Sequence, residues 1–180
     1  MNNETFFIRQ ETLSDIFNTQ QVIQEAFANV KESSQNEHQL VNKLRNLPQF
    51  IPELSLVAES VNGNIVGHVL LSEVEIVSKE RTDTLLALAP LSVLPSWQNQ
   101  GVGSALVLAA HREATRLNYK GVVVLGHPGY YSRFGYKPAS DFGIMMPFPD
   151  HLNCCLALPL RPNRLDDIKG NVVYPKVFFE

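Results

Sequence analysis

The chain has 180 residues, 44% of them hydrophobic, and a formal net charge of -3 at neutral pH. This length can bury one substantial core, so we expect a single domain over residues 1–180. The mild negative charge, without a Lys or Arg run, argues against a nucleic-acid partner. No apolar run reaches membrane-spanning length, and Glu4 in the polar first segment argues against a secretory signal. We therefore expect a cytoplasmic protein that binds no membrane.

The first half of the chain predicts two helices and a set of antiparallel strands. Thr12 or Ser14 offers an N-cap for the first helix. Asn62-Gly63 is a strong hairpin signal between two strands. The expected elements, in order, are a short strand at Phe6–Arg9, a helix through Ile16–Phe27, a helix at Asn36–Leu47 closed by Pro48 and Pro52, and strands at Leu54–Val61 and Asn64–Val77.

The middle of the chain predicts a strand, a glycine turn, a helix and a second strand. The strand is expected at Leu85–Val93 and contains Pro90, which cannot donate to a strand ladder. The helix is expected at Ser104–Leu117, and the apolar run Val122–Leu125 is typical of a buried strand. A strand, a helix and an apolar strand in succession indicate a parallel crossover.

The last third of the chain gives weaker signals. We expect a short helix at Tyr130–Phe134, stopped by Gly135, and extended chain from Tyr136 onward. Another strand is expected at Asn153–Leu158. The apolar tail could dock as a last strand of the sheet or lie against a partner, so a homodimer stays open.

The cysteines Cys154 and Cys155 are neighbours in the sequence. Adjacent cysteines do not form an ordinary structural disulfide, and no Cys-x-x-Cys motif is present. We interpret both as small residues of an apolar strand rather than nucleophiles or metal ligands. No His, Cys and Asp cluster has ligand spacing, so we expect no metal site.

The turn Gln98-Asn99-Gln100-Gly101-Val102-Gly103 is the most informative stretch of the sequence. A P-loop would require Lys after the last glycine, and a dinucleotide fingerprint would require Gly or Ala at Leu106. Neither is present. Glycines before a helix leave its first N–H groups open to an anion such as a pyrophosphate. Gln98, Gly101 and Gly103 fit the spacing Gln/Arg-x-x-Gly-x-Gly/Ala.

With the preceding strand, the stretch LSVLPSWQNQGVGS resembles the coenzyme A motif of the GNAT superfamily of N-acetyltransferases. The resemblance implies an α/β (α+β) fold with a central mixed, mostly antiparallel sheet flanked by helices and one parallel crossover after the coenzyme-binding helix. It implies acetyl-coenzyme A as co-substrate, with the strand beside the pantetheine arm and the turn around the pyrophosphate. The residues that it assigns to coenzyme binding are Leu91, Ser92, Val93, Gln98, Gln100, Gly101, Val102, Gly103 and Ser104.

The segment YYSRFGY resembles the family's short-helix motif, in which a Tyr lies four residues before the Gly of a Gly-aromatic pair. Gly135-Tyr136 is that pair, so the assignment falls on Tyr131 and not on Tyr130. A phenol has a pKa of about 10, so it keeps its proton at neutral pH and can offer it to a departing thiolate. The resemblance therefore implies that Tyr131 is the catalytic acid.

The sequence does not identify the general base. Glu73 and Glu75 share one face of a strand, and His127 ends the strand beside the expected cleft. His68 lies within a strand, where a histidine is more often a structural residue with satisfied hydrogen bonds.

The resemblance implies acetyl transfer to a primary amine of a small molecule or peptide, and since no nucleophile motif is present we expect direct transfer in a ternary complex. The alternative is a non-catalytic acyl-coenzyme A binding or sensing module on the same fold, which would have no need of Tyr131. The acceptor and the acyl chain length stay open.

Overall fold

The computed structural model describes residues 5–31 and 33–180; residues 1–4, which include Glu4, and residue 32 lie outside the described residues. The chain forms two compact units, Met1–Leu71 with Ala89–Glu113, and Ser72–Leu88 with Ala114–Glu180. The long strands β3 (Ile65–Val77) and β4 (Thr82–Val93) each contribute one half to each unit. That residues 1–180 act as a single domain stays a prediction.

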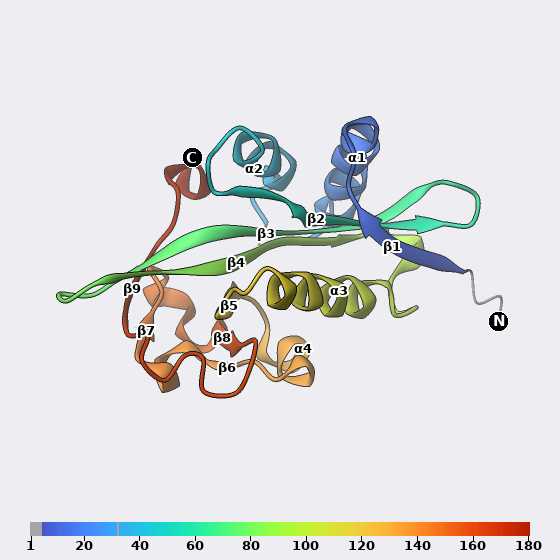
Figure 1. The fold of residues 1–180 in the computed structure, drawn as a ribbon. Coiled ribbons are helices and arrows are strands. Elements are labelled where there is room, and N and C mark those ends of the chain that lie inside the picture. The colour runs from blue at the N-terminus through green and yellow to red at the C-terminus, as the bar shows by residue number, and fades with distance from the viewer. Residues whose placement is uncertain (1–4, 32) are drawn as a thin grey trace. The chain divides into compact units, whose positions relative to one another are not determined.

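The first unit is a sheet with helices on both faces. Its strands follow the order β1-β2-β3-β4, and β1 pairs antiparallel with β2 from Phe6 opposite Ser60 to Gln10 opposite Leu56. Figure 1 shows α1 and α2 on one face of these strands and α3 on the other. The elements are β1 (Phe6–Gln10), a 3-10 turn at Leu13–Asp15, α1 (Ile16–Phe27), α2 (Glu37–Leu44), β2 (Phe50–Ser60) and most of α3 (Val102–Arg116).

The two faces of the first unit's sheet pack against their helices in different ways. Under α1, the buried side chains of Val22, Val57 and Ile65 form an apolar cluster. On the opposite face α3 approaches β3 closely, since a Cβ at Gly67 would lie 2.9 Å from the Leu106 side chain and 3.0 Å from that of Val102. The absence of a side chain at Gly67 therefore allows α3 to pack closely on this face of β3.

The second unit contains the other halves of β3 and β4. Strand β5 (Gly121–Leu125) runs parallel to β4, with Leu86 opposite Val122, which confirms the expected parallel crossover. Strand β8 (Cys155–Pro159) pairs antiparallel with β5, and β6 (Lys137–Pro138) pairs antiparallel with β8. The sheet is thus mixed and mostly antiparallel, as predicted.

The tail docks on the sheet of this unit. Strand β9 (Gly170–Val173) pairs antiparallel with β3, with Glu75 opposite Val173, and β7 (Ile144–Met145) pairs parallel with β9. One apolar core joins these strands to the last residues of the chain. Its buried members are Val74, Ile76, Leu85, Ala87, Val123, Ala139, Ile144, Met146, Cys155, Ala157, Leu165, Ile168, Val172 and Tyr174.

Several predicted boundaries are wrong. Helix α3 begins at Val102 and not at Ser104, because the positive φ of Gly101 (86°) turns the chain directly into the helix. Strand β2 begins at Phe50, so Pro52 lies within a strand; it precedes the residues that pair with β1, where a missing N–H is tolerated. Cys154 ends a 3-10 segment, and only Cys155 belongs to β8.

Candidate active site

The end of β4, the following turn and the first turn of α3 hold the residues predicted to bind the coenzyme. Ser92 is buried, with 1% of its surface exposed, whereas Leu91 and Val93 are half-buried. The Leu94 N–H donates to the Val66 carbonyl (2.9 Å), which keeps the end of β4 beside β3. A 3-10 turn at Pro95–Trp97 then leads into the glycine turn.

The glycine turn is exposed and is held by its own side chains. The Gln98 side-chain amide donates to the Val93 carbonyl (3.2 Å), and that of Gln100 donates to the Ser96 carbonyl (2.7 Å). Gly101 has a φ of 86°, which favours glycine, but a Cβ there would meet no atom within 4 Å. The glycine is therefore required by backbone conformation and not by crowding. The Gln98 and Gln100 side chains therefore hold the turn through hydrogen bonds to its neighbouring backbone carbonyls.

The first backbone N–H groups of α3 follow this exposed turn directly. Val102, Gly103 and Ser104 form the first turn of α3, a helix of 15 residues. The first N–H groups of a helix have no intrahelical acceptor, and the helix dipole adds partial positive charge there. An exposed turn that ends in such groups suits a phosphate.

Tyr131 lies in the second unit, at the end of α4 (Pro128–Tyr131). Its ring packs edge-on against Tyr130 (5.0 Å between ring centroids) and Tyr136 (5.4 Å). Only 8% of the residue is exposed. Burial, with a contribution from Tyr130, raises the pKa of Tyr131 above its ordinary value, so the phenol holds its proton at neutral pH.

Gly126 makes room for the Tyr131 ring. A Cβ at Gly126 would lie 2.3 Å from Cε2 and 2.7 Å from Cδ2 of Tyr131, closer than real atoms approach. The backbone after β5 therefore touches the ring directly. The nearby His127 caps α4, since its Nδ1 accepts from the Gly129 N–H (3.1 Å).

The base candidates of the second unit have other partners or are exposed. Glu73 accepts a hydrogen bond from the Tyr119 hydroxyl (2.5 Å). Glu75 is exposed, on the face of β3 opposite the buried Val74 and Ile76. His127 is exposed and its Nδ1 is occupied by the helix cap. None of the three is thereby identified as the base.

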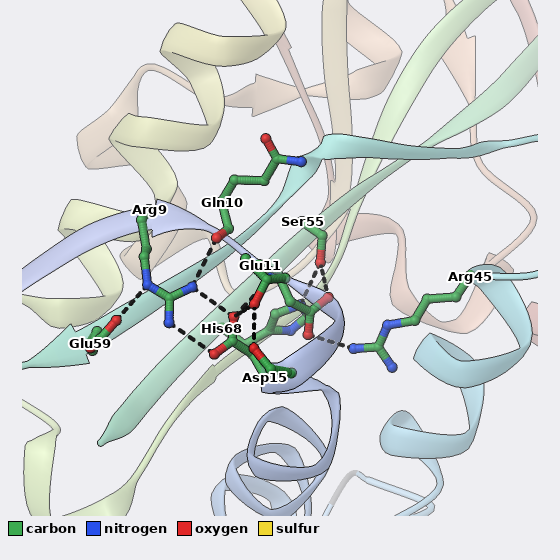
Figure 2. Close-up of polar contacts among 10 residues, drawn as sticks. Arg9, Gln10, Glu11, Asp15, Arg45, Ser55, Glu59 and His68 are labelled. Carbon is green, nitrogen blue, oxygen red and sulfur yellow. Dashed lines mark hydrogen bonds and ion pairs between the residues drawn. The ribbon is translucent and has the colours of Figure 1, made fainter. Parts of the chain in front are cut away.

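His68 belongs to a buried polar layer in the first unit, between the sheet and the helices α1 and α2 (Figure 2). Its Nε2 lies 3.0 Å from Ser55 Oγ, which in turn lies 2.7 Å from Glu11 Oε2. Arg45 Nη2 donates to Glu11 Oε1 at 2.6 Å. His68 is fully buried, and its Nδ1 has no hydrogen-bond partner among residues 5–31 and 33–180.

A second cluster lies next to this layer on the same face. Arg9 donates to both carboxylate oxygens of Asp15 (2.7 and 2.9 Å) and to Glu59 (2.5 Å). Asp15 also accepts from the Thr12 N–H and hydroxyl, which completes the cap of the 3-10 turn. The Arg9 and Thr12 donors outweigh burial and hold the pKa of Asp15 well below its usual range.

Sequence reasoning missed Glu11, Ser55 and Arg45. The available signal was weak: Ser55 and His68 are polar residues within strands that otherwise read as apolar. His68 was interpreted as a structural histidine with satisfied hydrogen bonds, and this is wrong for Nδ1.

Metal clusters and membrane-spanning helices are both absent from the described part of the chain, residues 5–31 and 33–180. There, no three His, Cys, Asp or Glu side chains gather in a way that could hold a metal ion. Over the same residues, no helix combines the length and apolar character needed to cross a membrane.

Comparison with known proteins gives concordant matches. Residues 52–138 match the family model described as an acetyltransferase (GNAT) domain. An uncharacterised N-acetyltransferase of Escherichia coli K12, YjhQ, is 33% identical over 154 residues, which cover 83% of this chain and 81% of the relative.

Two solved structures share the fold over nearly the whole chain. The GNAT family N-acetyltransferase YhbS of Escherichia coli, in complex with CoA, has a TM-score of 0.88 at 26% identity, over 98% of this chain and 93% of its own. A GNAT family acetyltransferase of Brucella melitensis, in complex with acetyl-CoA, has a TM-score of 0.79 at 31% identity, over 97% and 99%.

Proposed function

The chain belongs to the GNAT family of acetyltransferases, and on that premise we propose that it transfers an acetyl group from acetyl-coenzyme A to a primary amine in a ternary complex. The observation that carries the proposal is the exposed turn Gln98–Gly101 leading into the first turn of α3. The two solved relatives named above support it, since their structures contain CoA and acetyl-CoA.

The coenzyme-binding residues of the proposal are those of β4 and the turn. The pyrophosphate is bound by the backbone N–H groups of Gly101, Val102, Gly103 and Ser104, with Gln98 and Gln100 holding the turn in shape. Leu91, Ser92 and Val93 lie along the pantetheine arm. The bound thioester supplies an activated acetyl group.

Tyr131 is the proposed acid. Transfer leaves a thiolate, and the raised pKa of Tyr131 means that the phenol still carries its proton at neutral pH, when the sulfur needs one. The close packing against Gly126 and Tyr136 limits the positions that the hydroxyl can take. A covalent acyl-enzyme is not part of the proposal, because burial, with Cys154 adding to it, raises the pKa of the Cys155 thiol and leaves it a weak nucleophile.

The test is a thiol-release assay with acetyl-coenzyme A against amino acids, polyamines, aminoglycosides and peptide N-termini. With an accepted amine, Tyr131→Phe should lower kcat by about 100-fold, the usual size of a general-acid contribution, and leave coenzyme affinity nearly unchanged. Tyr130→Phe is the matched control on the neighbouring ring and should be milder.

The outcomes separate the candidate functions. Tight coenzyme binding without transfer to any amine would refute the proposed transferase activity and favour a binding or sensing module. Full activity of Tyr131→Phe, with chemistry as the slow step, would remove Tyr131 from the mechanism and leave the transferase intact.

A further inference from the structure

The hydrogen bonds of the buried polar layer have a fixed direction. A carboxylate only accepts, so the single proton of the Ser55 hydroxyl goes to Glu11 Oε2 (2.7 Å). The Ser55 oxygen must then accept from His68 Nε2 (3.0 Å), which makes His68 the Nε2–H tautomer. The chain runs from His68 through Ser55 to Glu11, and the bare nitrogen of His68 is Nδ1.

The inner end of this chain lies beside the strand assigned to the coenzyme. The Leu94 N–H donates to the Val66 carbonyl, and two residues further along this antiparallel register Ser92 stands opposite His68. Directly opposite residues point to the same face of a sheet. Ser92 Oγ, like His68 Nδ1, is buried without a hydrogen-bond partner in the described chain. Two unpartnered polar atoms thus occupy neighbouring positions of β3 and β4.

The outer end of the chain reaches a cavity. Glu11, Arg45 and Ser55 line a hollow of about 670 Å³ on the face that carries α1 and α2. Its other walls are amide and apolar side chains: Gln10, Asn42, Asn46, Leu13, Ile16, Phe50 and Pro52, with Thr12. The carboxylate side chain of Glu11 is itself 5% exposed. Glu11, at the outer end of the chain of hydrogen bonds, therefore borders this cavity.

Burial keeps His68 neutral at neutral pH, and the polar neighbours of Glu11 keep that carboxylate ionised. Burial lowers the pKa of His68 to about 4, with Glu11 opposing and Arg45 adding to the shift. Burial alone would raise the pKa of Glu11, but His68, the Ser55 hydroxyl and the Arg45 guanidinium together lower it. Glu11 and Arg45 are the charged groups that shift the pKa of His68, whereas Arg9 pairs with Asp15 and Glu59.

We propose that His68, Ser55 and Glu11 form the proton relay that serves as the general base of the transfer, with Nδ1 of His68 as its entry. This inference rests on the proposed function. When the amine attacks, its N–H bond breaks and the proton passes to Nδ1; Nε2 gives its proton to Ser55 Oγ, and Ser55 gives its own to Glu11 Oε2. No net charge forms on the imidazole, and Glu11 becomes neutral. After the product leaves, the three transfers reverse and the proton passes from Nδ1 to water.

Ser55 offers a matched pair of variants. Ser55→Thr and Ser55→Val add the same volume at this buried position and differ only in the hydroxyl. We expect kcat of the Thr variant within a few fold of wild type and that of the Val variant lower by about 100-fold, with equal coenzyme affinity. In mixtures of H2O and D2O, a plot of the wild-type kcat against the deuterium fraction of the solvent should be curved, because several protons move together. The same plot for the Val variant should be linear.

A second measurement does not depend on turnover. Nitrogen-15 NMR of the imidazoles should show His68 as the Nε2–H tautomer from pH 5 to 8. If the added methyl unfolds both variants, Ser55→Ala removes the hydroxyl without added volume, and the same loss is expected. Equal kcat of the Thr and Val variants, or an Nδ1–H tautomer, would overturn the relay while the transferase stands. A wild type that acetylates no amine would refute the proposed function and the relay with it.

Discussion

Replacement of Gly126 by alanine should displace the Tyr131 ring without touching its hydroxyl. The added Cβ would lie 2.3 Å from Cε2, so the ring must retreat by about 1 Å to reach an ordinary contact. Tyr130 and Tyr136 pack against the ring at 5.0 and 5.4 Å between centroids, so these two rings resist its movement toward them. Overpacking of this kind costs about 1–3 kcal/mol of stability.

The expected kinetic effect is larger than the effect on stability. A misplacement of about 1 Å at a catalytic group can lower a rate by about 100-fold. We therefore expect Gly126→Ala to lower kcat about 100-fold, with the coenzyme affinity measured by calorimetry nearly unchanged. Gly129→Ala is a control on α4, the helix that carries Tyr131, since its Cβ would meet the His127 side chain at 3.1 Å and not the Tyr131 ring.

A double-mutant cycle separates placement of the hydroxyl from general damage. If Gly126→Ala acts by moving the hydroxyl, it should add nothing to the kcat loss of Tyr131→Phe, because no hydroxyl remains to be misplaced. Its cost in thermal stability should persist in both backgrounds. If the two kcat losses instead multiply, the reasoning that links Gly126 to Tyr131 is refuted.

Three further predictions concern other parts of the chain. Gly103→Val should weaken coenzyme binding at least ~10-fold, about 1.4 kcal/mol by calorimetry, because a branched side chain would block the first turn of α3. Since the folded pKa of Asp15 is lowered, its contribution to stability is present above the unfolded value of about 3.9 and is lost as the pH falls below it; Asp15→Asn should flatten the acid limb of the Tm profile, and an unchanged limb would contradict this. Changing both Cys154 and Cys155 to Ala should keep most of the transfer rate, whereas a ~1,000-fold loss in a folded protein would indicate an acyl-enzyme.

The features that were predicted well from the sequence depend on residues that are close to one another along the chain. The Asn62-Gly63 hairpin is confirmed, because Gly63 adopts a φ of 82° and its N–H reaches the Ser60 carbonyl at 2.9 Å. The parallel crossover is confirmed for a similar reason, since a strand, a helix and an apolar strand in sequence have few ways to pack. The start of α3 at Val102 was missed by two residues, because the positive φ of Gly101 decides where the helix begins.

The buried polar layer could not be predicted, because its contacts join distant residues. Glu11 lies 44 positions from Ser55 and 34 from Arg45, and Ser55 lies 13 from His68. No local spacing rule connects a residue after β1, a residue of β2, one of β3 and one after α2. Each of these residues taken alone has an ordinary structural interpretation, so only the fold shows that they meet.

The buried polar layer of Glu11, Arg45, Ser55 and His68 adds little to the stability of the fold or lowers it, which indicates a functional role. A buried ion pair such as Glu11 with Arg45 adds little net stability, and well-packed apolar residues of the same volume would often do as well or better. A fully buried neutral histidine with a bare Nδ1 adds a further penalty, because an unpaired buried acceptor loses its hydration. A fold held only by packing would gain by replacing these residues. Their combination next to the end of β4 is therefore better explained by proton transfer, and it is at functional sites that sequences depart from the rules of stability.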